Sequence, residues 1–328
     1  MPEEKYIPPY TVTDKIISLV AQISERIGAV IVQSGMDSNP HLRRDSRIKT
    51  IHASLAIENN SLSLDQVTAI INGKRVLGPP DEIREVQNAY EAYNRLLEFD
   101  PYSIEDLLSA HRLLMTDLTR EAGRFRSGGV GIFAGERLVH MAPPAARVPE
   151  LLVQLKEWAK GSEAHPLIKS CVFHYEFEFI HPFADGNGRM GRMWQTLLLY
   201  QWKPMFAWLP VETLIRERQQ GYYDALKLAD KAADSGVFVE FMLQAIADAL
   251  IELSQTAQVR AQVTAQVERL LEVLEGGEFS TIELMERLNL KHRQSFRNLY
   301  LLPALELGLV AMTIPDKPNS SNQKYRKA

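Results

Sequence analysis

A chain of 328 residues, 45% of them hydrophobic, is long enough for a substantial core and one or two smaller modules. Its formal net charge of −4 argues against indiscriminate binding to nucleic acid or anionic lipid, and its one cysteine, Cys171, excludes a disulfide framework. The N-terminus has neither the basic start nor the apolar run of a signal peptide, and no apolar segment approaches the roughly 20 residues that span a bilayer. These features predict a cytoplasmic protein without a membrane partner.

Most of the chain shows apolar side chains at the three- and four-residue spacing that predicts helices. In the first half this pattern covers residues 13–32, 45–58, 63–72, 80–98, 103–118 and 147–160. Two of these segments begin with the serine and acceptor spacing of a helix cap, at Ser63 and Ser103. The pattern resumes at residues 166–180, 188–201, 211–234 and 237–275. The fold class is therefore mainly α.

Residues 123–146 interrupt the helical pattern. Two short β-prone runs, Val130–Phe133 and Leu138–Met141, are joined by a glycine-containing connection and followed by two prolines. This order predicts a β-hairpin. Its glycines lack the strand-then-helix context of a phosphate-binding loop, so they do not indicate one.

Beyond the glycine pair that ends the last long helix, two short predicted helices and a hairpin-like tail resemble a winged helix-turn-helix. Residues 281–328 contain eight Lys or Arg and four Asp or Glu, so this segment carries +4 while the rest carries −8. The asymmetry is compatible with DNA binding through the helix at 292–302 and the tail. The alternative is a protein-interaction or dimerisation module.

The stretch of the sequence that indicates chemistry is HPFADGNGRMGR, residues 181–192. A buried helix is predicted to end just before it, and Pro182 prevents the simple continuation of that helix. Gly186 and Gly188 permit a tight turn that exposes backbone N–H groups where the next helix begins. Such a helix N-terminus, with Arg189 and Arg192 beside it, makes a site for a polyphosphate.

Two further side chains complete the chemistry of this stretch. Asp185 supplies a carboxylate oxygen for Mg²⁺, which typically binds through one or two carboxylates plus substrate phosphates. His181 can accept a proton from an attacking hydroxyl. An anion cradle, a metal ligand and a base together predict a phosphoryl- or nucleotidyl-transfer site.

The same stretch matches the Fic family signature, H-P-F-x-[D/E]-G-N-G-R-x-x-R, at every fixed position. Residues 45–250 as a whole resemble that family. Residues 123–146 are similar to its flap, which aligns a target peptide by strand addition, and residues 216–230 to its adenine-side helix. The resemblance divides the chain into an N-terminal helical region, a Fic core, a connecting helix and a winged-helix-like domain, at 1–98, 99–250, 251–275 and 276–328.

The resemblance implies a protein adenylyltransferase, which transfers AMP from ATP to a Ser, Thr or Tyr hydroxyl of a target protein docked on the flap, or of the enzyme itself. It implies His181 as the general base, Asp185 as the Mg²⁺ ligand and Arg192 as the partner of the γ-phosphate. The remaining nucleotide-binding residues that it implies are Gly186, Asn187, Gly188, Arg189, Tyr222 and Tyr223. Relatives are often homodimers, and Asp230 departs from the Asn that close relatives often have near adenine.

Residues 54–59, SLAIEN, match the family's inhibitory pattern, [S/T]-x-x-x-E-[G/N], at Ser54, Glu58 and Asn59. Their position before the Fic core resembles the subclass with an N-terminal inhibitory helix, here about residues 45–60. Glu58 could pair with Arg192 and occupy the guanidinium that should hold the γ-phosphate. In some relatives the same Glu supports removal of AMP, so the direction of the reaction stays open.

Three further alternatives remain beside transfer and removal of AMP. The chain could be a DNA-binding regulator whose Fic core senses nucleotide, or the site could transfer UMP, phosphate or phosphocholine. His174, Glu178 and His181 lie at positions i, i+4 and i+7, so they could also share a helix face and bind zinc. A zinc site leaves the following GNGRMGR unexplained.

Overall fold

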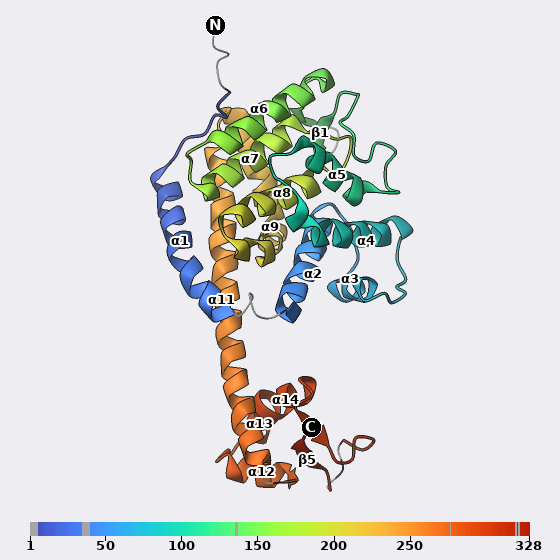
Figure 1. Cartoon of the computed structure of the whole chain (residues 1–328), viewed down its shortest axis with the longest axis vertical. Helices are drawn as coiled ribbons and strands as arrows, with labels where there is room; N and C mark the ends of the chain where they lie inside the picture. Colours follow the sequence, from blue (N-terminus) through green and yellow to red (C-terminus); the bar gives the residue numbers. More distant parts are fainter. Residues whose placement is uncertain (1–5, 35–39, 135–136, 276, 319, 321) are drawn as a thin grey trace. The chain divides into compact units, whose positions relative to one another are not determined.

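The computed structural model describes residues 6–34, 40–134, 137–275, 277–318, 320 and 322–328, which are mainly helical (Figure 1). The chain divides into two compact units, Met1–Leu253 and Ser254–Ala328. Over the described ranges, no helix has both the length and the apolar character needed to cross a membrane.

The first unit begins with helices α1 to α5 and continues through the strand pair to the helices that carry the motif. Its elements are α1 (Asp14–Ser34), α2 (Pro40–Ile57), α3 (Leu64–Ile71), α4 (Pro80–Asn94), α5 (Ile104–Met115), β1 (Gly131–Ala134), β2 (Arg137–Met141), α6 (Val148–Gly161), α7 (Pro166–Ile180), α8 (Asn187–Trp202), α9 (Val211–Glu217), α10 (Gln219–Ala232) and the first part of α11 (Gly236–Leu274). The two predicted caps are confirmed, because Ser63 and Ser103 each accept a hydrogen bond from the backbone N–H three residues on.

The mainly helical fold class is confirmed, with two local corrections. The prediction of one helix over 211–234 is wrong, because the backbone leaves the helical region at Arg218 (φ −114°, ψ 32°) and separates α9 from α10. Apolar spacing cannot show this break, since both short helices bury a face in the same core. The predicted inhibitory helix also stops early. Asn59 takes a left-handed conformation (φ 69°), so Glu58 lies in the turn after α2.

The centre of the first unit is the pair α7 and α8, which pack against each other (Figure 1). Side chains are buried around nearly the whole circumference of α7, as expected for a helix at the centre of a bundle. On one side α2 packs against α4 and α9 and contacts α8. The turn that joins α7 to α8 therefore lies between well-packed elements.

The predicted hairpin is confirmed. Strands β1 and β2 are antiparallel, with Gly131 opposite Met141 and a register irregularity after Ile132. Residues 135–136 of the predicted connection lie outside the described residues.

The second unit is built from the end of α11, two short helical segments and a small sheet. Its elements are β3 (Phe279–Ser280), α12 (Thr281–Arg287), α13 (Arg293–Phe296), a π-helical turn (Arg297–Leu301), α14 (Leu302–Glu306), β4 (Val310–Met312) and β5 (Lys324–Lys327). The antiparallel strand order is β3-β5-β4. A separate apolar core includes Leu270, Leu284, Phe296 and Leu301, so this unit buries its own hydrophobic surface.

Candidate active site

The motif turn depends on two left-handed residues. His181 ends α7 with φ 50° and ψ 63°, and Gly186 precedes α8 with φ 85°. A Cβ at Gly186 would lie 2.8 Å from the sulfur of Met115, so both the backbone conformation and the packing favour glycine. The turn places the exposed residues Ala184 and Asp185 just before the N-terminus of α8.

Asn187 and His111 fix the shape of this turn. The Asn187 amide closes a two-way hydrogen bond with the main chain of Phe183, at 2.9 and 2.8 Å. His111 Nδ1 accepts from Gly123 N–H, so its Nε2 carries the proton and donates to the carbonyl of Asp185 at 3.0 Å. Burial lowers the pKa of His111 to about 4, which keeps the ring neutral. His111 is thus a supporting residue, which its sequence context does not reveal.

Arg126 ties the base of the hairpin to the same turn. Its guanidinium donates to the carbonyls of His181 at 2.7 Å, Ile180 at 3.3 Å and Gly128 at 2.8 Å, and also to that of Pro143. The side chain is only 3% exposed. The sequence places Arg126 in the predicted flap but indicates no role for it, because a carbonyl oxygen is supplied by every residue type and so gives no sequence signal.

Arg189 is buried and held by two carboxylates. Its Nη1 lies 2.8 Å from Glu85 on α4, and its Nη2 lies 3.3 Å from Asp185. Glu85 was not predicted. Its other oxygen accepts a hydrogen bond from Asn60 at 2.8 Å, which links Arg189 to the segment that follows α2.

The Asp185 side chain is 63% exposed. Over the part of the chain that the structure describes, no three or more His, Cys, Asp or Glu side chains are grouped to hold a metal ion. A single exposed carboxylate suits Mg²⁺, which takes its remaining ligands from phosphates and water, and does not suit a dedicated protein metal cage.

The predicted contact between Glu58 and Arg192 is present. Glu58 Oε1 lies 2.7 Å from Nη2 of Arg192, and Ser54 accepts from the guanidinium through its hydroxyl and its carbonyl, at 3.1 and 3.0 Å. Burial lowers the pKa of Arg192, but Glu58, Tyr222 and Glu178 together raise it by more, and the net direction is upward. A Cβ at Gly188 would lie 2.3 Å from Glu58 Oε1, so the glycine makes room for this contact.

The two tyrosines of α10 lie in different environments. Tyr222 is 1% exposed, and its hydroxyl lies 3.1 Å from Nε2 of His174 inside the core. Tyr223 is 43% exposed, and its hydroxyl donates to the carbonyl of Ile57 at 3.3 Å. Their roles in nucleotide binding stay predictions. Both ring nitrogens of His174 are engaged, by Tyr222 and by Gln195, which argues against the zinc alternative.

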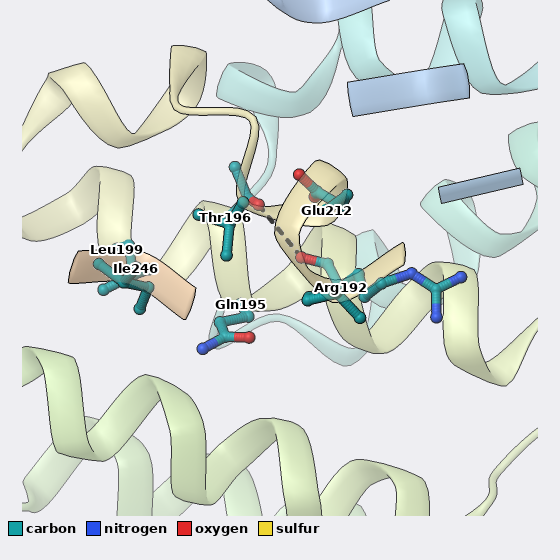
Figure 2. A pocket seen from close by; sticks show the side chains of 8 residues that line it. Arg192, Gln195, Thr196, Leu199, Glu212 and Ile246 are labelled. Carbon is teal, nitrogen blue, oxygen red and sulfur yellow. Dashed lines mark hydrogen bonds between the residues drawn. The ribbon is translucent and has the colours of Figure 1, made fainter. Parts of the chain in front are cut away.

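A small cavity lies beside Arg192, between α8, α9 and α11 (Figure 2). Its volume is about 10 Å³, close to the least that accommodates one water molecule, so it cannot hold a nucleotide. Figure 2 shows the Arg192 side chain extending away from Leu199 and Thr196 at this cavity. Glu212, in its lining, is 2% exposed, and burial raises its pKa to about 7.

Comparison with known proteins finds two family models. The Fic/DOC family matches residues 101–199, and "Filamentation induced by cAMP protein Fic-like, C-terminal domain" matches residues 265–327. Among curated relatives, the protein adenylyltransferase Fic of Aedes aegypti is 29% identical over 226 residues, which cover 64% of this chain and 43% of the relative. That of Drosophila erecta is 30% identical over 220 residues, 63% of this chain and 42% of the relative. The chain thus spans less than half the length of these relatives.

Solved structures agree. A Fic family protein from Desulfovibrio desulfuricans G20 is 56% identical, with a TM-score of 0.76 and 98% of both chains covered. Fic-1 from C. elegans, 22% identical with a TM-score of 0.57 over 74% of this chain and 75% of that one, shares the fold. The motif geometry, the family models and the extended match together show that this chain belongs to the Fic family.

Proposed function

We propose that this chain is a protein adenylyltransferase that transfers AMP from ATP to a hydroxyl of a target protein, and that Glu58 restrains it. The observation that carries this proposal is one turn-and-helix segment in which His181 and Arg192 flank the N-terminus of α8. The curated relatives, which are named protein adenylyltransferases, support the reaction.

In the proposed reaction a target segment adds as a strand to the hairpin, and its hydroxyl points at His181. The hydroxyl proton passes to His181 while oxygen attacks the α-phosphorus and the bond to pyrophosphate breaks. Backbone N–H groups at Gly186, Asn187 and Gly188 stabilise the developing negative charge at the positive end of α8, with Arg189 on the phosphates. Asp185 would hold Mg²⁺, which when bound neutralises phosphate charge.

Glu58 restrains this reaction by competing for one guanidinium. Arg192 is 1% exposed and already has Glu58 and Ser54 as partners. A γ-phosphate must displace Glu58 to reach Arg192, and without that contact the α-phosphate is not aligned for in-line attack. The same geometry could instead place Glu58 to assist removal of AMP, so the test must measure both directions.

The experiment follows AMP from labelled ATP into protein, with the chain itself and a cell extract as acceptors. We expect weak labelling by wild type, at least tenfold more by Glu58→Gly, and none when His181→Ala is added. Glu58→Gln is the matched control, because it removes the charge and keeps the size. Labelling unchanged by both Glu58 variants would contradict the restraint by Glu58, and labelling that survives His181→Ala would contradict the role of His181 as the base.

Release of AMP by wild type but not by Glu58→Gly would favour the reverse reaction. Mass spectrometry of the product identifies the group transferred.

The second unit supports a separate candidate function, DNA binding. Its order of helix, strand, two helices and a strand pair resembles that of a winged helix-turn-helix, which supports this candidate. Exposed cations line the start of its third helix at Lys291, Arg293 and Arg297, and β5 adds Lys324 and Arg326. This charge fits a phosphate backbone.

Salt-dependent binding to duplex DNA tests this candidate. If Arg293 and Arg297 each contact a phosphate, then replacing both by Ala should reduce the slope of log K against log salt by about 2. The control is replacement of Glu283 and Glu286 by Ala, which leaves these cations in place. Absence of salt-sensitive binding, together with a concentration-dependent dimer in sedimentation, would instead favour a dimerisation module.

A further inference from the structure

We propose that Glu178 is a positioning residue for His181, through both its main-chain carbonyl and its carboxyl group. The inference rests on the proposed function, since it concerns how the base is held. Glu178 lies in the last turn of α7, and its carbonyl oxygen is 3.2 Å from Nδ1 of His181. A carbonyl only accepts hydrogen bonds, so Nδ1 carries the proton and Nε2 keeps the lone pair that a base needs. Glu178 Oε2 lies 4.0 Å from the same Nδ1.

The carboxyl group of Glu178 is costly to the fold. Its side chain is 9% exposed, and its buried Oε1 has no hydrogen-bond partner among the described residues. Gly191 makes room for it, because a Cβ there would lie 2.6 Å from Oε1. A glycine in the middle of a helix destabilises it relative to alanine. Packing alone does not explain an unsatisfied carboxyl that also demands a glycine, whereas a role at His181 does.

His174, the other imidazole beside Glu178, is held neutral. Gln195 Nε2 donates to the sulfur of Cys171, so the Gln195 oxygen accepts from His174 Nδ1 at 2.7 Å. Nε2 of His174 therefore accepts from the Tyr222 hydroxyl. Burial lowers the pKa of His174 to about 3. His174 gives Glu178 no positive charge, which leaves the imidazolium of His181 as the cation that forms on this side during the reaction.

The remaining groups that face Glu178 link its pKa to the presence of Glu58. Burial raises the pKa of Glu178 to about 8, Arg192 on α8 lowers it, and Glu58 after α2 raises it. Burial raises the pKa values of Tyr222 and Tyr223 on α10, and the Glu178 carboxylate raises them further. With Glu58 in place, Glu178 is therefore mostly protonated near neutral pH. Removal of Glu58 takes away a negative neighbour and frees Arg192, and both changes favour the Glu178 carboxylate.

The ionised carboxyl acts at one point in the reaction. As the target oxygen bonds to the α-phosphorus, its proton moves to Nε2 of His181, and pyrophosphate leaves with the electron pair of the broken bond. The new imidazolium still donates its Nδ1–H to the Glu178 carbonyl, and it lies next to the Glu178 carboxylate. The attraction between these opposite charges stabilises the protonated base until solvent takes the proton.

The test compares three forms that all carry Glu58→Gly: that variant alone, with Glu178→Gln, and with Glu176→Gln. Glu176 is the matched control, because it is buried on the same helix with a raised pKa but its carboxylate accepts from Tyr6 at 2.6 Å. We expect kcat/KM for AMP transfer to rise with pH as Glu178 ionises, at a midpoint below 8. Glu178→Gln should remove the step of this rise that comes from Glu178, leave the step that comes from His181, and lower kcat about tenfold above the midpoint, with KM for ATP unchanged. Glu176→Gln should show the same rise of kcat/KM with pH, and the same kcat, as the Glu58→Gly parent. A Glu178→Gln profile that matches the parent would overturn the proposal.

A second measurement needs no catalysis. Nitrogen NMR of labelled histidines, with His181 assigned by its loss in His181→Ala, reports the tautomer and the pH at which the ring takes up a proton. We expect a proton on Nδ1 in the neutral ring, and a lower protonation midpoint when Glu178→Gln is added to Glu58→Gly than in Glu58→Gly alone. Absence of AMP transfer alongside this shift would refute the proposed function and leave the positioning intact. An unchanged midpoint, in a variant with native circular dichroism, would overturn the positioning.

Discussion

Two segments dock on the motif turn, and they do so by different kinds of contact. The segment at the end of α2 contacts a side chain, since Glu58 and Ser54 hold the guanidinium of Arg192. The base of the hairpin contacts main chain, since Arg126 donates to the carbonyls of His181 and Ile180. A phosphate can replace a carboxylate on an arginine, but no ligand replaces a buried carbonyl. The first contact is therefore suited to regulation and the second to holding the fold.

The largest effect is expected at Arg126. Arg126→Met keeps much of the apolar stem but leaves four carbonyls without their charged donor, so we expect the free energy of unfolding to fall by about 2–4 kcal/mol. Urea denaturation measures this fall. Arg124→Met, at an exposed neighbouring position, is the control and should change stability by less than about 0.5 kcal/mol. Equal urea midpoints for Arg126→Met and Arg124→Met would show that the carbonyl contacts of Arg126 do not hold the fold.

A smaller effect is expected at Glu58, and it should depend on nucleotide. Glu58→Gly leaves the buried Arg192 charge without its carboxylate, which we expect to cost about 1–2 kcal/mol because Glu58 is 32% exposed. ATP should then raise the melting temperature of the variant more than that of wild type, since its phosphates meet a free guanidinium. Thermal melts at several ATP concentrations measure both changes. Equal ATP-dependent shifts in the two proteins would mean that Glu58 does not compete with nucleotide.

The difference between side-chain and main-chain contacts explains which parts of the site could be predicted from the sequence. The contact between Glu58 and Arg192 was predictable, because it pairs opposite charges within two recognisable patterns. Arg126 and His111 were not, because they bind carbonyl oxygens 55 and 74 residues away, and any residue type supplies a carbonyl. Helix spacing predicted most elements but not the break at Arg218, where ψ changes without any change in apolar pattern.

The smallest effect tests the middle of α2, where Arg47 packs on the rings of Tyr93 and Trp208 close to Glu212. Burial raises the pKa of Glu212 to about 7 from 4.5, while Arg192 and Arg47 oppose that shift. Between these values the folded chain binds more protons than the unfolded chain, so this carboxyl stabilises the fold fully below about pH 4.5 and progressively less as the pH rises through 7.

Glu212→Gln removes this dependence. The stability of wild type minus that of the variant should fall as the pH rises from 5 to 8, and urea midpoints across this range measure the fall. Histidines such as His111 and His174 titrate in both proteins, so their contributions cancel in the difference. A difference that stays flat would show that Glu212 is ionised throughout. The Glu212 carboxylate would then be attracted to the Arg47 guanidinium at every pH tested, and α2 would dock through charge near both Arg47 and Glu58.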